Sequence, residues 1–158
     1  MIDDQPTRDA VYVRTIRADD LDAVVRIDAA STGRRRERFL AQKVAQAVAD
    51  TGVTVSLVAE LDDRIAGFLL ARLYYGEFGV LEPAAVLDVI GVHPDVRGRR
   101  VAAALIDQLR TNLLGLGIAT LQTEVAWTQP DLVAFFQHEG FTLAPRLCLD
   151  LDLPGTRT

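Results

Sequence analysis

The chain has 158 residues, of which 49% are hydrophobic and 25% are charged, and these values are typical of one globular domain with a single core. Its formal net charge of −5 argues against general binding to nucleic acid or to anionic membranes. There is no apolar run near the ~20 residues of a membrane span, and Cys148 is the only cysteine. We therefore expect a cytoplasmic protein with no membrane segment, no internal disulfide and no metal.

The first third of the chain predicts one strand followed by two helices. Residues 11–16 alternate apolar and polar side chains, and Asp19 or Asp20 can cap the helix that follows. Two sets of side chains should face inward: Leu21, Val24, Val25 and Ile27 in the first helix, and Phe39, Leu40, Val44 and Val48 in the second. The Arg34–Arg36 cluster between the helices has two interpretations, an attraction for anions or a solvated helix start paired with Glu37.

The next segment predicts an antiparallel hairpin. Residues 54–59 and 65–75 have the apolar composition of strands, and the turn at 62–64 is of the kind that joins them. Residues 76–83 form the most irregular internal stretch, which we interpret either as the wall of a binding pocket or as an ordinary exposed loop.

The stretch from residue 86 to residue 117 joins a buried strand to a helix through a basic turn. Residues 86–92 are mostly apolar, and Pro94 ends the strand. A core-facing stripe then predicts a helix: Ala102, Leu105, Ile106, Leu109 and Leu113. The first turn of a helix has backbone N–H groups without partners, and Arg97, Arg99 and Arg100 place positive charge beside it. The segment therefore predicts a phosphate-binding turn.

The last third predicts a strand, a helix and a final strand. Residues 119–127 alternate in a strand pattern, and a helix can begin at Pro130 and end at Gly140. Residues 143–153 supply material for the last strand.

Two segments carry a family resemblance. Arg97-Gly98-Arg99-Arg100-Val101-Ala102 resembles the Arg/Gln-x-x-Gly-x-Gly/Ala signature of the GNAT acyltransferase superfamily, and residues 135–141 resemble its second recurrent segment. The resemblance implies one α/β domain over residues 1–158, with a core from about 11 to 153, in which about four helices flank a mixed central sheet. Arg100 stands where the family usually has Gly, and we expect it to keep right-handed dihedral angles and to point outward.

The resemblance also implies the site that binds the acyl donor, acetyl-CoA or another acyl-CoA. The strands before and after the phosphate turn splay apart in this family, and the pantetheine arm pairs with the first of them. The pantetheine residues would be Ile90, Gly91 and Val92, and the pyrophosphate residues would be Arg97, Gly98, Arg99, Arg100, Val101, Ala102 and Ala103. Gln129 replaces an Asn that commonly contacts the cofactor.

Catalysis needs a base for the amine and an acid for the departing thiolate. Asp88, in an apolar strand, is the first candidate base, with a structural hydrogen-bonding role as its alternative. Glu124 is the second, with a solvated side chain as its alternative. The family's usual acid, a Tyr, is replaced here by Phe136, which leaves three explanations: water, a hydroxyl from Tyr74 or Tyr75, or no catalysis.

The function that the resemblance implies is N-acetyltransfer from acyl-CoA to a primary amine of a small molecule or protein. The alternative is a non-catalytic acyl-CoA-binding or regulatory module of the same fold. A nucleotide-phosphate binder is less favoured, because no Gly-Lys-Ser/Thr follows the turn. Family members often dimerise, so a homodimer is an expectation too.

Overall fold

The structure is a computed structural model that describes residues 10–49 and 55–155. These residues fall into two compact units, one ending at Glu124 and the other beginning at Val125. The helices and strands of the first unit are β1 (Tyr12–Thr15), α1 (Leu21–Thr32), α2 (Glu37–Ala49), β2 (Leu57–Leu61), β3 (Arg64–Tyr74), β4 (Ala84–Val92), α3 (Val101–Gly115) and β5 (Leu121–Thr123). The second unit contains α4 (Pro130–His138). The assignment of residues 1–158 to one domain stays a prediction.

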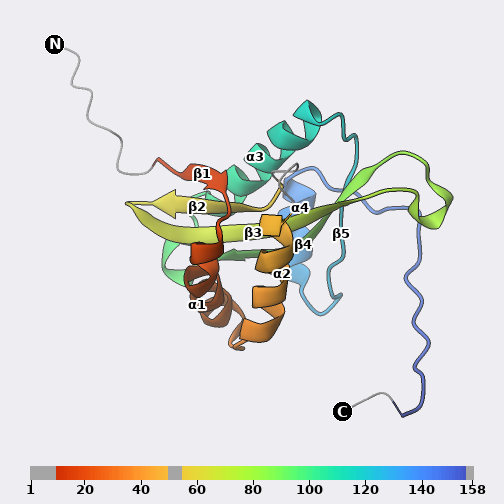
Figure 1. The fold of residues 1–158 in the computed structure, drawn as a ribbon, viewed down its shortest axis with the longest axis horizontal. Coiled ribbons are helices and arrows are strands. Elements are labelled where there is room, and N and C mark those ends of the chain that lie inside the picture. The colour runs from red at the N-terminus through yellow and green to blue at the C-terminus, as the bar shows by residue number, and fades with distance from the viewer. Residues whose placement is uncertain (1–9, 50–54, 156–158) are drawn as a thin grey trace. The chain divides into compact units, whose positions relative to one another are not determined.

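The five strands form one mixed sheet in the order β1-β2-β3-β4-β5. The first four pair antiparallel, and β5 pairs parallel to β4, so the predicted mixed α/β architecture is confirmed. Asp62 and Asp63 turn β2 into β3 with positive φ angles, as a tight hairpin turn requires. Figure 1 shows β3 and β4 continuing past the other strands as a long hairpin.

Helices cover both faces of the sheet. Phe68 and Leu70 of β3 pack into a buried cluster with side chains of α1 and α2. Gly67, next to Phe68 and on the opposite face of the strand, faces α3, because a Cβ built on it would lie 2.8 Å from Cγ1 of Val101. Figure 1 accordingly shows α1 and α2 on the near side of the strands and α3 behind them. Strand β4, at the centre of the site described below, is therefore fixed from both faces.

Gly91 of β4 is needed for packing rather than for an unusual backbone angle. A Cβ at this position would lie 2.7 Å from Cε1 and 3.0 Å from Cζ of the Phe68 ring, which is fully buried. The ring therefore covers the backbone of β4 where any other residue would place a side chain. The absence of a side chain at residue 91 keeps the strand and the core beneath it in contact.

We predict that Gly91→Ala lowers the free energy of unfolding by about 1–3 kcal/mol, because the added methyl group must displace the Phe68 ring. Gly115→Ala, in the last turn of α3, is the matched control, since its Cβ would meet no atom within 4 Å. The control should be neutral or stabilising by up to about 1 kcal/mol. Urea denaturation measures both variants, and equal midpoints for the two would contradict this account of Gly91.

Asp20, one of the two predicted caps of α1, uses its side chain for other hydrogen bonds. Asp20 is the N-cap residue of α1, but its carboxylate accepts from the Arg17 amide at 2.7 Å and from Arg14 at 2.8 and 2.9 Å. Burial opposes the charge of Asp20, but these hydrogen bonds outweigh it and lower its pKa. Asp20 thus ties β1 to the start of α1 instead of capping the helix with its side chain.

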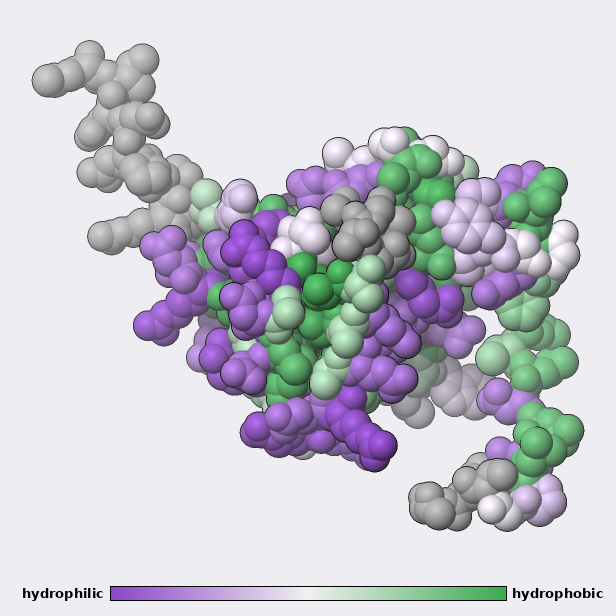
Figure 2. Space-filling view, viewed as in Figure 1, coloured by the Kyte–Doolittle hydropathy of each residue, from purple (hydrophilic) through white to green (hydrophobic). Residues whose placement is uncertain are grey.

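The arginine cluster before α2 is mostly paired within the protein. Arg36 Nε donates to Asp28 Oδ2 at 2.9 Å, and Arg35 Nε lies 3.3 Å from Glu37 Oε2. Figure 2 shows strongly hydrophilic side chains gathered where α1 and α2 are joined. The structure thus favours the solvated helix start over an anion site.

Four predictions were wrong, two about the apolar face of α2 and two about strands. Phe39 is 40% exposed, and its ring lies near two cations instead of in the core, with Arg36 at 5.2 Å and Lys43 at 6.0 Å from its centroid. Val48, near the end of α2, is 37% exposed. Strand β5 covers only residues 121–123 of the predicted 119–127, because its pairing with β4 ends there. Residues 143–153, in the second unit, contain no strand.

Candidate active site

Strand β4 has an edge that β5 covers only in part. The parallel pairing joins Ala85, Val86 and Leu87 to residues 121–123 and then stops. The Thr123 hydroxyl donates to the Leu87 carbonyl at 3.0 Å, at the last of these pairs. From Asp88 to Val92, none of the described strands pairs with this edge of β4. This unpaired edge from Asp88 to Val92, which we call the slot, therefore offers a short row of backbone donors and acceptors.

Alternation along β4 decides which backbone groups face this open edge. The N–H of His93 donates to the Ala66 carbonyl at 2.8 Å, so His93 and Gly91 direct their backbone groups toward β3. Ile90 and Val92 consequently direct theirs the other way, and both residues are half-buried. An extended ligand can thus pair with the backbone of residues 90 and 92, as a short added strand would.

The open edge leads directly into the N-terminus of α3. After the turn Pro94–Val96 the helix begins at Val101, and its first intrahelical bond runs from the Ala104 amide to the Arg100 carbonyl at 3.0 Å. The amides of residues 101–103 precede that bond and have no acceptor within the helix. An open hollow of about 500 Å³ beside this helix end is lined by Gly98, Arg99, Arg100 and Ala103 among others. Free amides, the helix dipole and arginines together suit a phosphate group.

The three arginines of the turn lie in different environments. Arg97 Nη2 donates to Ser31 Oγ of α1 at 3.5 Å, which is a long contact, and Arg99 Nη1 lies 4.0 Å from Asp62 Oδ2. Arg100 has φ 61° and ψ 25°, which is the left-handed conformation. The expectation of right-handed angles at Arg100 was therefore wrong. The reason is that α3 begins at Val101, so Arg100 lies at the bend before the helix and not in its first turn. A Gly, which the family usually has here, would adopt the left-handed conformation without strain.

We predict that Arg100→Gly is more stable than Arg100→Ala by about 1 kcal/mol, because only Gly relieves the Cβ strain of a left-handed residue. Both variants remove the same charge, so the difference between them reports backbone strain alone. Thermal denaturation of the two proteins measures it. A Gly variant no more stable than the Ala variant would contradict the strained conformation.

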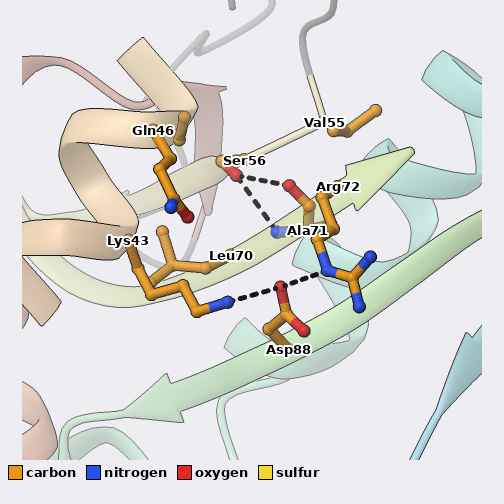
Figure 3. A pocket seen from close by; sticks show the side chains of 9 residues that line it. Lys43, Gln46, Val55, Ser56, Leu70, Ala71, Arg72 and Asp88 are labelled. Carbon is orange, nitrogen blue, oxygen red and sulfur yellow. Dashed lines mark hydrogen bonds and ion pairs between the residues drawn. The ribbon is translucent and has the colours of Figure 1, made fainter. Parts of the chain in front are cut away.

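Asp88 lies at an irregularity of β4, where the register with β3 passes from Leu87 directly to Val89. Its side chain is only 18% exposed although the residue as a whole is exposed, so its exposure comes from the backbone on the open edge. Asp88 Oδ2 lies 3.3 Å from Lys43 Nζ and 3.4 Å from Arg72 Nε (Figure 3). The carboxylate is thus ion-paired on the face covered by α2 while its backbone borders the slot.

Lys43 and Arg72 are residues of the candidate site that the sequence did not lead us to predict. Arg72 carried a signal, because it is a charged side chain in an otherwise apolar strand, as Asp88 is. Lys43 carried none, because its helix has other surface cations and only the fold places it beside β4.

The other predicted catalytic residues lie elsewhere in the first unit. Glu124 is exposed and comes just after β5 ends, rather than within a strand. Tyr74 donates its hydroxyl to Gln122 Oε1 at 2.5 Å, and it pairs with Ala84, at the opposite end of β4 from the phosphate turn. Tyr75 is exposed. In the part of the chain that the structure describes, neither tyrosine lies at the turn end of the slot.

Two predicted residues belong to the second unit. Phe136 is buried, and its ring lies 5.3 Å from that of Phe135 and 4.9 Å from that of Phe141. It therefore has a packing role within this unit. Gln129 is the N-cap residue of α4, and its side chain makes no capping bond. Its part in cofactor binding stays a prediction.

A family comparison accounts for this combination of open strand, turn and helix. The profile described as "Acetyltransferase (GNAT) family" matches residues 21–141, which include every element from α1 to α4. The chain belongs to the acetyltransferase (GNAT) family. Members of this family are acyl-CoA-dependent N-acetyltransferases.

Solved structures show the same fold. An aminoglycoside antibiotic 6'-N-acetyltransferase from Acinetobacter baumannii superposes with a TM-score of 0.76 at 19% identity, over 92% of this chain and 100% of that one. A ribosomal-protein-alanine N-acetyltransferase from Brucella melitensis gives 0.72 at 19%, over 91% and 100%. An aminoglycoside N-acetyltransferase solved in complex with CoA gives 0.75 at 17%, over 90% and 95%. The superpositions show the GNAT fold, and at these identities they leave the acceptor open.

Residues 10–49 and 55–155 contain no group of three or more His, Cys, Asp or Glu side chains that could hold a metal ion. None of the helices within these ranges combines the length and apolar character that crossing a membrane needs.

Proposed function

We propose that this GNAT protein transfers an acetyl or other acyl group from acyl-CoA to a primary amine. The observation that carries the proposal is the continuity between the open edge of β4 and the N-terminus of α3. Strand-like backbone pairing followed by an anion site matches the two chemical parts of CoA, an amide-containing arm and a pyrophosphate. A free phosphate or a nucleotide would use the anion site alone.

The residues present fit this donor. Ile90 and Val92 would pair through their backbone groups with the amides of the arm, while Gly91 keeps the strand packed against Phe68. The pyrophosphate would lie at residues 97–103, where the amides of Val101 to Ala103 are available. When bound, acyl-CoA supplies the thioester carbonyl that the amine attacks.

Asp88 is the residue we propose to take the proton from the amine. It lies beside the slot, and its Oδ2 faces the two cations while its Oδ1 has no ion-pair partner among the described residues. Lys43 and Arg72 hold the carboxylate in one orientation. Glu124, exposed after β5, is the second candidate and has no such support.

Release of the thiolate needs no side-chain acid on this proposal. A thiol of pKa near ~8.5 is a fairly good leaving group, so water can supply the proton.

The second candidate function, a non-catalytic acyl-CoA-binding or regulatory module, is favoured by one observation, the buried Phe136 at the position of the family's Tyr. A cytoplasmic location and a homodimer stay predictions.

The experiment that separates these functions measures CoA release with a panel of amines at saturating acetyl-CoA, together with calorimetric titration of acetyl-CoA. Turnover that depends on both substrates supports the transferase. Binding without turnover supports the binding module. No binding at millimolar acetyl-CoA would overturn both.

We predict that Gly98→Glu weakens acetyl-CoA binding at least tenfold relative to Gly98→Ala. Both variants carry a Cβ at φ +83°, and a Cβ at this position would meet no atom within 4 Å, so their backbone strain is equal. They differ in the negative charge that Glu brings to the anion site. Calorimetry measures the two affinities, and equal values would remove the phosphate assignment from this turn.

We predict that Asp88→Asn lowers kcat about 100-fold or more near neutral pH and changes acetyl-CoA affinity less than about twofold. The loss should shrink as the pH rises, because more of the amine is already deprotonated. A rate profile against pH and the thermal midpoint of each protein provide the measurements. A loss that is the same at every pH and accompanies a large fall in thermal midpoint would mean that Asp88 has a structural role only.

A further inference from the structure

A small pocket lies on the α2 side of the sheet, next to the proposed base. It has a volume of about 150 Å³ and is walled by α2, by the residues entering β2, and by β3 and β4. Figure 3 shows Lys43 reaching into it from α2, Arg72 from β3 and Asp88 from β4. The polar wall on the β2 side is already satisfied, because the Ser56 hydroxyl donates to the Ala71 carbonyl and accepts from the Ala71 amide.

The charges of this lining do not cancel. Lys43 and Arg72 both approach the same oxygen of Asp88, at 3.3 and 3.4 Å, so the described residues of the lining carry one surplus positive charge. This surplus stands out in a chain whose net charge is −5. If the cations served only to neutralise Asp88, one of them would be enough, and the second would add repulsion.

The two cations also have donors to spare. An ammonium has three N–H donors and a guanidinium has five, and each group makes one ion pair here, with Asp88. The Gln46 amide points toward the same space (Figure 3). The pocket therefore combines one carboxylate that can accept from an ammonium with several donors suited to a second anionic group.

We propose, on the basis of the function proposed above, that the acceptor is an amine that also carries a carboxylate. Its amine faces Asp88, and its carboxylate lies between Lys43 and Arg72. An acceptor with an ammonium alone would raise the positive charge of the pocket further, and a polycation such as an aminoglycoside would raise it more. An amino acid or a similar zwitterion leaves it unchanged.

The size of the pocket agrees with an end group of this kind. Pockets that enclose a whole drug-sized ligand measure about 300–1,000 Å³, so 150 Å³ accommodates the charged end of a small acceptor. The acceptor class thus differs from the aminoglycosides named for two of the structural neighbours.

The test compares matched acceptors that differ in one charge. Glycine, β-alanine and 4-aminobutyrate place the carboxylate at increasing distances from the amine, and the amide of each removes the charge while keeping the shape. With acetyl-CoA saturating, at least one acid should exceed its own amide in kcat/KM by about tenfold or more, mainly through KM. An aminoglycoside should be a poorer acceptor than that acid.

Variants then assign the preference to the pocket. Lys43→Gln and Arg72→Gln should each reduce the ratio of acid to amide by about tenfold, whereas Arg38→Gln, which removes an exposed charge from the same helix, should leave it unchanged. The change in this ratio between wild type and variant is the useful readout. An acid and its amide differ in the pKa of their amines, but that difference is the same for every protein, and an effect on Asp88 acts on both members of a pair. Circular dichroism confirms that the variants are folded.

Failure of this proposal can be told apart from failure of the proposed function. Calorimetry with acetyl-CoA tests the donor site, and ligand-observed NMR with each acid and its amide tests the pocket without turnover. Three outcomes would overturn the carboxylate proposal in a protein that binds acetyl-CoA. They are equal use of acids and amides, a preference for an aminoglycoside, and the absence of NMR binding for every acid. A preference for acids that both pocket variants abolish supports it.

Discussion

The early end of the β4–β5 pairing is the constraint on which the proposed site depends. Parallel pairing covers only Ala85 to Leu87, and the remaining edge of β4 keeps its backbone groups available. Such an edge is normally a liability in a protein. Here it leads into a helix N-terminus with free amides, so we propose that the same strand that organises the core also binds the ligand. Phe68 over Gly91 holds this strand in place from the α1/α2 face, and α3 packs on the other face of the sheet.

Local signals in the sequence predicted most elements of the first unit. The stripe in α3, the hairpin at Asp62 and the strand before Pro94 all rest on periodicity and turn chemistry, which act over a few residues. The wrong predictions needed information about partners. Alternation continues past Thr123, but a strand also requires a neighbour for its N–H and C=O groups, and a sequence pattern does not contain the neighbour.

The same distinction applies to the site. The basic turn before α3 could be predicted because its parts are consecutive in the sequence, whereas the left-handed angle of Arg100 depended on where α3 begins. Asp88 was noticed as a charge in an apolar strand. Its partners Lys43 and Arg72 are 45 and 16 residues away, and only the fold brings them together. The surplus charge that points to a carboxylate-bearing acceptor was therefore invisible in the sequence.

Backbone amide hydrogen exchange with and without acetyl-CoA tests the central claim most directly. The amides of Ile90 and Val92 face the open edge of β4, and those of Val101 to Ala103 lie at the free end of α3. The account predicts that all of them exchange readily in the free protein and become protected when acetyl-CoA binds, while the amide of His93, already bonded to Ala66, changes little. Binding that leaves residues 90 and 92 unprotected would contradict it.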